Sequence, residues 1–307
     1  LNTTYRLDVT RPGLQLNPAW TPLTWYSTSV TLDATASDAH AGVQSIILDG
    51  ALTGGPSASQ VISRAQTGVY TIDGLALDNA GNTQAGSTTY RLDMTLPDIA
   101  VTPSWTPTAW YSQPVSLTAS ASDAHSGMAS ISLDAQTFAG DSASKTISRT
   151  VSGVYTITGL ARDVVGNERP IAPLTYQLDL ARPDIALAPA WNQTAWYSQP
   201  VMLEAAATDA PEVMGAPVSG IAWLALDGET FGGPAATKIV SRTVSGVYTI
   251  TGATGDAAGL TRAATATYKH DATAPFFSSI SPAQGIADDR CQTYAPQPGF
   301  TWSAAVA

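Results

Sequence analysis

Charged residues are scarce in this chain of 307 residues. Asp, Glu, Lys and Arg make up 12% of it, about half the usual share, and Ser, Thr, Ala, Gly and Gln take their place. The net charge is −10, and the only lysines are Lys145, Lys238 and Lys269. Because phosphate contacts need clustered basic side chains, this composition argues against nucleic acid as a partner.

Long apolar runs and cysteines are also missing. No apolar stretch approaches the roughly 18 residues that a membrane helix needs, so we expect no membrane insertion in this segment. The first residues do not read as a signal peptide, which we expect to have been removed or to lie upstream. The single cysteine, Cys291, is either a reduced thiol or half of a disulfide whose partner lies elsewhere. Each domain must therefore be held by its apolar core.

One stretch is written four times along the chain. It reads Tyr-Arg-Leu-Asp-x-Thr-x-Pro at residues 5–12 and 90–97, and it recurs with changes at residues 176–183 and 268–275. A period of about 86 residues is too long for a solenoid unit and suits one small β-sandwich. We interpret the stretch as the last strand of one domain, a hinge and the first residues of the next.

Between these stretches the pattern is typical of β-strands. Short segments alternate apolar and polar residues, as at 30–36, and turn residues follow about every 8–12 positions, without helical periodicity. Tyr70, Tyr155 and Tyr248 each lie two residues after a glycine and two before an isoleucine, the spacing of a tyrosine corner. We therefore predict an all-β chain of tandem immunoglobulin-like β-sandwich domains, joined end to end by short Pro-containing linkers.

The repeats define the expected domain boundaries. Residues 1–10 read as an orphan last strand of a preceding or neighbouring-subunit domain, plus a linker. Residues 11–95, 96–181 and 182–273 read as three Ig-like domains, and residues 274–307 as the start of a different, incomplete β domain. The third repeat differs by an insertion at residues 211–217 and by Leu260 at a position where the others have asparagine.

The order of motifs resembles the tandem bacterial Ig-like repeats of large secreted and cell-surface proteins, over about residues 8–275. In the second repeat the likeness is carried by Asp93, Trp110, Tyr111, Ser112, Ser122, Asp123, Ser126, Gly127, Leu133, Asp134, Gly153, Tyr155, Ala161, Asp163, Gly166 and Asn167. The resemblance implies an extracellular or cell-surface location and a role as stalk, spacer or occasional binding module.

Acidic and amide side chains recur where each domain should meet its linker. In an immunoglobulin topology two turns and the incoming linker converge at one end. The residues concerned are Asp8, Asp38, Asp78 and Asn82 in the first repeat, and Asp93, Asp123, Asp163 and Asn167 in the second. Calcium favours such oxygens, so calcium at the joints is one interpretation and the only cofactor considered. Capping of tight turns by these side chains is the other.

Paired aromatic residues recur before the second strand of each domain. They are Trp20, Trp25 and Tyr26, then Trp105, Trp110 and Tyr111, then Trp191, Trp196 and Tyr197. Three roles are open: plugging the end of the core, packing at the joint with the next domain, and contact with carbohydrate.

Nothing in the sequence predicts catalysis. Nucleophile-elbow, phosphate-loop and metalloprotease motifs are absent, and the histidines are not expected to assemble a site. We predict a non-catalytic structural segment of an extracellular bacterial surface protein, a semi-rigid stalk or fibre of roughly 100 Å or more from three domains in line.

Two finer predictions concern partners. The partners are expected to be other copies of the chain or further repeats. Strand complementation between the two ends would build a filament. The other interpretation, which we favour, is that both ends are cuts in a longer chain. The alternative function is a spacer or carbohydrate-contacting module of a secreted multidomain enzyme or adhesin, with surface polysaccharide as partner.

Overall fold

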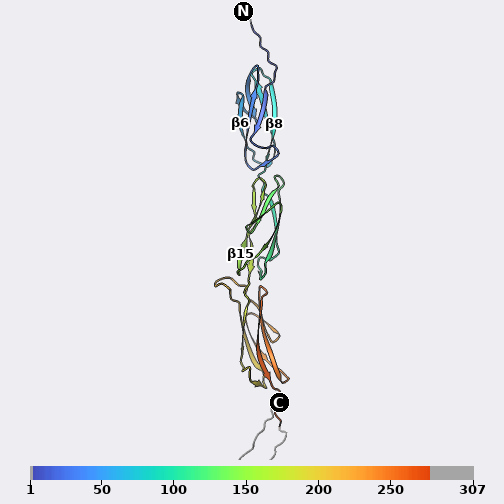
Figure 1. Ribbon diagram of the computed structural model, residues 1–307, viewed down its shortest axis with the longest axis vertical. Coiled ribbons are helices and arrows are strands. Elements are labelled where there is room, and N and C mark those ends of the chain that lie inside the picture. The colour runs from blue at the N-terminus through green and yellow to red at the C-terminus, as the bar shows by residue number, and fades with distance from the viewer. Residues whose placement is uncertain (1–2, 277–307) are drawn as a thin grey trace, which may run out of the picture. The chain divides into compact units, whose positions relative to one another are not determined.

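The computed structural model describes residues 3–276, and all regular secondary structure in this range is β-strand (Figure 1). Among these residues, no helix is long and apolar enough to cross a membrane. Residues 3–10 form no strand, and the Tyr5 side chain is 83% exposed. The incomplete domain expected at 274–307 lies almost entirely outside the described residues.

The first sandwich packs a three-stranded sheet on a five-stranded sheet. Its strands are β1 (Gly13–Pro18), β2 (Trp25–Tyr26), β3 (Val30–Ser37), β4 (Val43–Leu48), β5 (Ala51–Gly54), β6 (Ser57–Ile62), β7 (Gly68–Asp78) and β8 (Thr83–Leu92). The sheet orders are β1-β3-β6 and β2-β8-β7-β4-β5. All pairs are antiparallel except β2 with β8, which is parallel. This is the predicted all-β, Ig-like sandwich.

The third sandwich repeats this arrangement. Its strands are β19 (Asp184–Pro189), β20 (Trp196–Tyr197), β21 (Val201–Thr208), β22 (Ile221–Leu226), β23 (Glu229–Gly232), β24 (Ala235–Val240), β25 (Gly246–Asp256) and β26 (Thr261–His270). The sheet orders are β19-β21-β24 and β20-β26-β25-β22-β23. The chain divides into two compact units: the first two sandwiches with residues 211–219, and the third sandwich.

The second sandwich has the same strands with its larger sheet interrupted. They are β9 (Asp98–Pro103), β10 (Trp110–Tyr111), β11 (Val115–Ser122), β12 (Met128–Leu133), β13 (Gln136–Ala139), β14 (Ser142–Ile147), β15 (Gly153–Ile157), β16 (Gly159–Asp163), β17 (Glu168–Pro170) and β18 (Leu174–Leu178). The sheets are β14-β11-β9, β10-β18-β15 and β13-β12-β16-β17. One additional residue between Tyr155 and Tyr176 separates β17 from β18, and Ile171 is buried there, donating its N–H to the Gly159 carbonyl.

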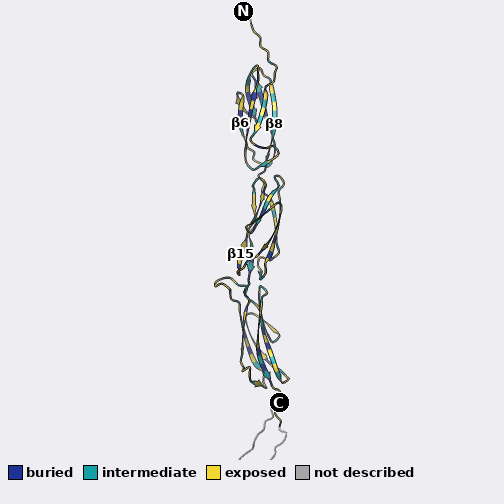
Figure 2. Ribbon diagram, in the orientation of Figure 1, coloured by how far each residue is buried: buried dark blue, intermediate teal, exposed yellow. Residues whose placement is uncertain are grey.

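Alternation along the strands places the core of each sandwich between its sheets. In β3, Leu32 and Ala34 are buried while Asp33 and Thr35 are exposed, and Figure 2 shows the same alternation along other strands. Tyr90 of the repeated stretch is fully buried, and its hydroxyl donates to the Thr28 carbonyl at 2.6 Å. Tyr176 and Tyr268 occupy the equivalent places. Since each domain contains this anchored tyrosine, the repeat marker is also a core element.

Candidate functional site: the linker ends of the sandwiches

The turns that follow β3 and β7 are capped by aspartates. Asp38 Oδ1 accepts hydrogen bonds from the backbone N–H groups of His40, Ala41 and Gly42 at 2.8–3.0 Å. These bonds, first of all the one from His40, lower the pKa of Asp38. Asp78 Oδ1 likewise accepts from the N–H groups of Ala80 and Asn82. Turn capping is therefore part of the geometry.

The incoming linker contacts both of these turns. Asp8 Oδ2 accepts the Ala41 N–H at 3.0 Å, and its Oδ1 caps its own turn at Thr10. The Asn82 amide donates to the Asp8 carbonyl at 3.3 Å and to Asp78 Oδ2 at 2.9 Å. The four residues expected to converge at the first joint are thus side by side.

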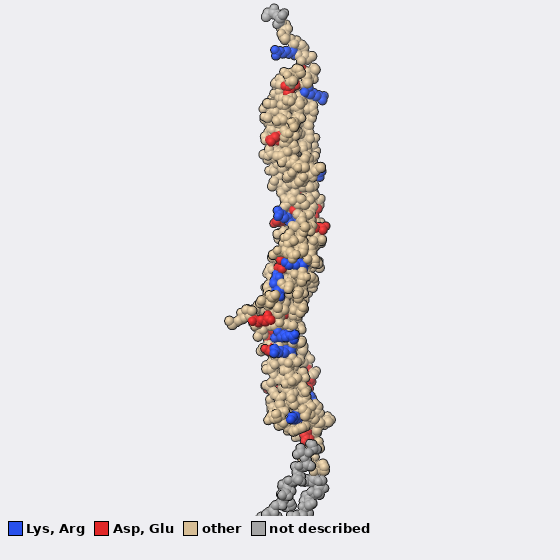
Figure 3. Space-filling model, in the orientation of Figure 1, with Lys and Arg blue, Asp and Glu red and all other residues tan. Residues whose placement is uncertain are grey.

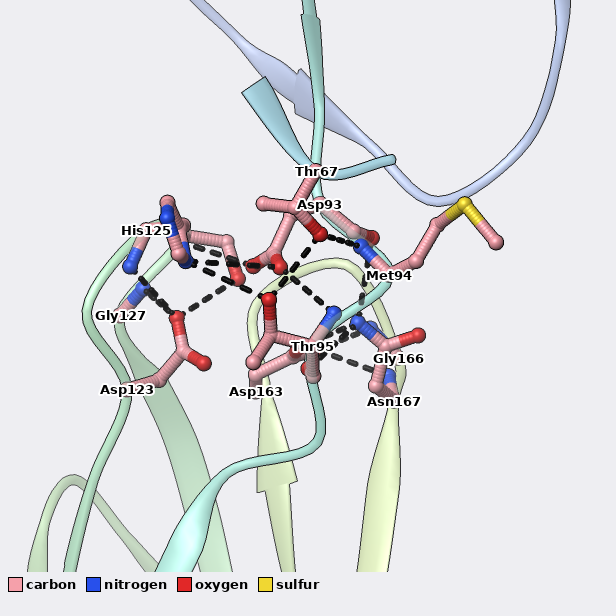
Figure 4. Close-up of polar contacts among 11 residues, drawn as sticks. Thr67, Asp93, Met94, Thr95, Asp123, His125, Gly127, Asp163, Gly166 and Asn167 are labelled. Carbon is pink, nitrogen blue, oxygen red and sulfur yellow. Dashed lines mark hydrogen bonds and ion pairs between the residues drawn. The ribbon is translucent and has the colours of Figure 1, made fainter. Parts of the chain in front are cut away.

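The same contacts recur where the first sandwich passes into the second (Figure 4). Asp93 is fully buried, and its Oδ2 accepts the Ser126 N–H while its Oδ1 accepts the Thr95 N–H. Asp123 Oδ1 caps its turn by accepting the N–H groups of His125 and Gly127. Burial by itself would raise the pKa of Asp93, but the hydrogen bonds from Ser126 and Thr95 outweigh it and hold the pKa below its usual value.

Asn167 connects the second turn to the linker. Its amide nitrogen donates to the carbonyls of Asp93 and Thr95 and to Asp163 Oδ2, at 2.7–3.2 Å. Asp163 in turn accepts the N–H groups of Gly166 and Asn167. In addition, the Ser27 hydroxyl donates to the Val165 carbonyl at 3.1 Å. Linker and turns therefore form one continuous hydrogen-bonded network.

At the first two joints, two groups of side chains have the proximity that a cation would need. Ligand atoms of Asp8, Asp38 and Asp78 lie within 4.8 Å of one another. At the second joint the equivalent group consists of Asp93, Asp123 and His125, so a histidine joins where Asp163 was expected. The expectation that histidines assemble nothing is corrected here, because the turn places His125 beside the linker. The signal in the sequence was the equivalent position of His40 and His125.

One oxygen in each group has no partner. Asp38 Oδ2 and Asp123 Oδ2 are buried and make no hydrogen bond within the described residues. A buried carboxylate oxygen is costly unless a donor or cation compensates it. Both groups therefore fit a cation in charge and proximity, and the first, with oxygen ligands alone, fits calcium better than the second.

The third sandwich keeps the caps and lacks the amide. Asp209 Oδ2 accepts the Gly220 N–H at 2.7 Å, and Asp256 Oδ1 accepts the Leu260 N–H at 2.8 Å. Leu260 stands where Asn82 and Asn167 bond the linker, and a leucine side chain has no donor.

The nine aromatic residues divide between core and surface. Trp20, Trp105 and Trp191 are buried, and each indole N–H donates to a carbonyl at 2.7 Å, as the core-plug interpretation requires. Tyr26, Tyr111 and Tyr197 accept a backbone N–H of the preceding turn through their hydroxyls.

Trp25 is half-buried and packs edge-on against the His125 ring at 5.5 Å, which is joint packing. Trp110 is half-buried, and Trp196 is 55% exposed with Lys269 over its ring.

The tyrosine corners are present in all three sandwiches. The hydroxyls of Tyr70, Tyr155 and Tyr248 donate to the carbonyls four residues upstream, at 2.6–2.8 Å.

Sequence reasoning missed an arginine on each of these corners. Arg64 lies over the Tyr70 ring at 5.1 Å and forms a two-point ion pair with Asp49 at 2.7 and 2.9 Å. Asp49 has a φ of 46°, in the tight turn between β4 and β5. Equivalent sets are Arg149 with Asp134 and Tyr155, and Arg242 with Asp227 and Tyr248. A signal existed, because each arginine follows its aspartate by 15 residues in every repeat.

Comparison with known proteins finds only distant similarities. No protein-family profile matches the chain, and neither does any curated protein. Among solved structures, the fibronectin(III)-like modules of CbhA from Clostridium thermocellum share 16% identity at a TM-score of 0.29, covering 53% of this chain and 93% of that one.

Two further solved structures are similar to parts of the chain. A tetra-tandem repeat from the extending region of a large adhesion protein shares 20% identity at a TM-score of 0.33, covering 87% of this chain and 76% of that one. The D00-D0 domain of intimin shares 14% identity at a TM-score of 0.28, covering 53% and 98%. The strand order and pairing described above define a tandem series of Ig-like β-sandwiches. Likeness at these TM-scores carries no argument about fold or activity.

Proposed function

We propose that this chain is a non-catalytic structural segment of an extracellular surface protein, in which Ig-like sandwiches in series form a semi-rigid stalk. The observation that carries the proposal is the recurring linker contact. Asp8 and Asp93 each accept a backbone N–H from the next turn, and Asn82 and Asn167 each donate to the linker carbonyls. Residues that repeat at both joints and bond the linker serve geometry rather than a single reaction site.

The physical argument is one of restricted freedom. A linker of a few residues that contains a proline already has few conformations. Adding buried, charge-assisted hydrogen bonds from its carboxylate, and an amide that bonds two of its carbonyls, restricts it further. Such a joint transmits orientation from one domain to the next, as a stalk requires.

Small-angle X-ray scattering of the chain tests this proposal. Three sandwiches in series, each about 35–45 Å long, should give a maximum dimension above about 100 Å that does not change with salt. A maximum dimension near about 60 Å would mean that the sandwiches fold back on one another, and the stalk would be excluded.

We also propose that the first joint binds calcium through Asp8, Asp38 and Asp78. The support is the grouping of three carboxylates and the unpartnered Oδ2 of Asp38. A cation there would compensate the negative charge at Asp38 Oδ2, whereas the turn N–H groups compensate only the other carboxylate oxygens.

Melting with and without metal decides the calcium proposal. About 10 mM calcium should raise the melting temperature of the first sandwich relative to a chelator, because an ion that binds only the folded state stabilises it. Asp38→Asn should abolish this shift, and Asp73→Asn, at an exposed site on β7, should retain it. An identical melting curve in calcium and chelator would leave turn capping as the only role of these aspartates.

A carbohydrate-contacting module is the second candidate function, and Trp196 is the observation that favours it. Its ring is 55% exposed, with the Lys269 ammonium 6.0 Å from the ring centroid. An exposed indole is a surface on which a sugar ring can stack. Retardation of the chain in polysaccharide-containing gels that is lost in Trp196→Ala would support this role. Equal mobility with and without polysaccharide would exclude it.

A further inference from the structure

Each sandwich has two open strand edges on one side. In the first sandwich β6 ends the three-stranded sheet and β5 ends the five-stranded sheet, and the two strands are joined through Gly55 and Pro56. Within the described residues, β6 pairs only with β3, so its other side has no strand partner. An unpaired edge presents backbone N–H and C=O groups that can pair with another strand.

In the second and third sandwiches, the edge strand equivalent to β6 carries a lysine. Lys145 lies on β14 and Lys238 on β24, at the fourth position of each strand. Both side chains are mostly buried, at 17% and 19% exposure, and they reach carbonyls of the turn in the other sheet. An inward-pointing charge on an edge strand is a recognised device against edge-to-edge pairing.

The edge strand β6 of the first sandwich has no lysine. Gln60 stands at the equivalent position of β6, and residues 51–63 contain no charged side chain. The exposed side chains along the two edges include Leu52 at 69% and Val61 at 60%. The corresponding segments 136–148 and 229–241 each carry charge, through Asp141 and Lys145 and through Glu229 and Lys238. Figure 3 shows how sparse charge is on the face of the molecule in view.

From this contrast we propose that β6 of the first sandwich is a self-association surface, pairing antiparallel with β6 of a second copy of the chain. Antiparallel pairing of identical strands about a two-fold axis needs only one patch and closes as a dimer. An uncharged strand edge pairs best with another uncharged strand. A second copy of the chain offers the same uncharged β6, although the chain as a whole has a net charge of −10. A lysine at this position would point inward as Lys145 and Lys238 do, and a strand added at the edge would cover its charge, which disfavours the pair.

Sedimentation of the chain provides the test, between about 1 μM and about 1 mM protein. The wild-type chain should show a concentration-dependent dimer, and Gln60→Lys should raise the dimer dissociation constant by about tenfold or more. The matched control is Gln15→Lys, an identical change at an exposed position of β1, on the opposite edge of the same sheet. It should leave the dimer unchanged. Circular dichroism confirms that both variants are folded.

Cross-linking locates the contact independently. In a Cys291→Ser background, Ser59→Cys on β6 should form a disulfide-linked dimer on oxidation, whereas Gln15→Cys on β1 should not. A wild-type chain that stays monomeric over the whole range overturns the proposal. So does an unaltered dimer in Gln60→Lys, or cross-linking through position 15 instead of 59. A monomer would leave the stalk proposal untouched, because that one depends on the joints.

Discussion

Buried aspartates are the residues on which the joints depend. Asp78, Asp93, Asp163 and Asp179 are all buried, a position in which an isolated carboxylate would be strongly disfavoured. Each is instead surrounded by backbone N–H donors, such as that of Ser219 for Asp179 at 2.8 Å. Hydrogen bonds of this kind lower the pKa of Asp78 and Asp93, so these two carboxylates couple folding to pH.

Acid should therefore destabilise the chain. The pKa of Asp93 is held below its ordinary value, so the folded state binds fewer protons than the unfolded state around pH 4. The resulting stability is fully present above about pH 5 and is lost as pH falls through the folded pKa. We expect the unfolding free energy to be flat from about pH 7 to 5 and to decrease below about pH 4. Chemical denaturation at several pH values measures it.

A substitution identifies Asp93 as one source of this dependence. Asp93→Asn should cost about 1–3 kcal/mol at pH 7, because the buried N–H groups lose a charged acceptor, and it should flatten the acid limb. The exposed Asp73→Asn is the control and should change neither. If the unfolding free energy of Asp93→Asn decreased below about pH 4 as steeply as that of the wild-type chain, Asp93 would not be a source of the pH dependence.

The arginine over each tyrosine corner should contribute measurably to stability. Arg64 and Asp49 are each 23% exposed, and the guanidinium makes two hydrogen bonds as well as stacking on Tyr70. Arg64→Ala should destabilise the first sandwich by about 1–2 kcal/mol. Hydrogen exchange of the β7 amides resolves this domain from the others.

A second arginine serves as the matched control. Arg162 lies 3.7 Å from Glu168 with both side chains about half exposed. Arg162→Ala should change the stability of the second sandwich by no more than about 0.5 kcal/mol. Equal effects of the two substitutions would show that the two hydrogen bonds and the ring contact of Arg64 add nothing to stability.

At the scale of the strand, the second sandwich depends on one glycine. A Cβ at Gly159 would collide with the Ser132 backbone carbonyl and crowd Ile171 and Leu133 at 3.2 Å. Gly159→Ala should therefore destabilise the second sandwich by about 3 kcal/mol, since neither backbone can move aside without breaking the sheet. At Gly86 the nearest atom to an added Cβ is Leu14 Cδ2 at 3.6 Å, so Gly86→Ala should be nearly neutral. Hydrogen exchange of the two domains compares them directly.

The strands themselves were largely predictable from the sequence. Alternation at residues 30–36 and the spacing around Tyr70 are local signals, and both lead to the observed β3 and β7. The interruption of the second sandwich at Ile171 was not predicted, because one inserted residue does not disturb the local pattern. The effect of the inserted residue appears only in the strand pairing, where β17 pairs with β16 in one sheet and β18 pairs with β15 in another.

The residues of the candidate site were predictable, and their grouping was predictable at the first joint but not at the second. Topology alone brings Asp8, Asp38, Asp78 and Asn82 together, and the structure does so. The inclusion of His125 depends on side-chain direction in a turn, which spacing does not specify. The arginines on the corners depend on contacts between the two sheets, which no single strand reveals.

On the scale of the whole molecule, the asparagine at the joint should couple neighbouring domains. Asn167 donates to two linker carbonyls and to Asp163. Asn167→Ala should remove about 1–2 kcal/mol of mutual stabilisation between the first and second sandwiches, so that their calorimetric transitions separate.

The control lies at the equivalent position one domain earlier. Asn82 bonds Asp8 and Asp78, so Asn82→Ala should lower the stability of the first sandwich without altering how the first and second are coupled. Transitions that separate equally in both variants would show that the effect arises in the turn rather than at the joint.

The two sides of a joint are made of different groups, and this gives the chain a direction. The leaving end contributes a carboxylate, linker carbonyls and a tryptophan, through Asp93, Thr95 and Trp25, and the receiving end contributes N–H groups, an amide and an imidazole, through Ser126, Asn167 and His125. A leaving end cannot satisfy another leaving end, so domains join in one polarity only. A gene segment of one period from the first two repeats, wherever its boundaries fall, carries a complete leaving end and a complete receiving end. Duplication or deletion of such a segment changes the length of the array and leaves every remaining joint chemically intact.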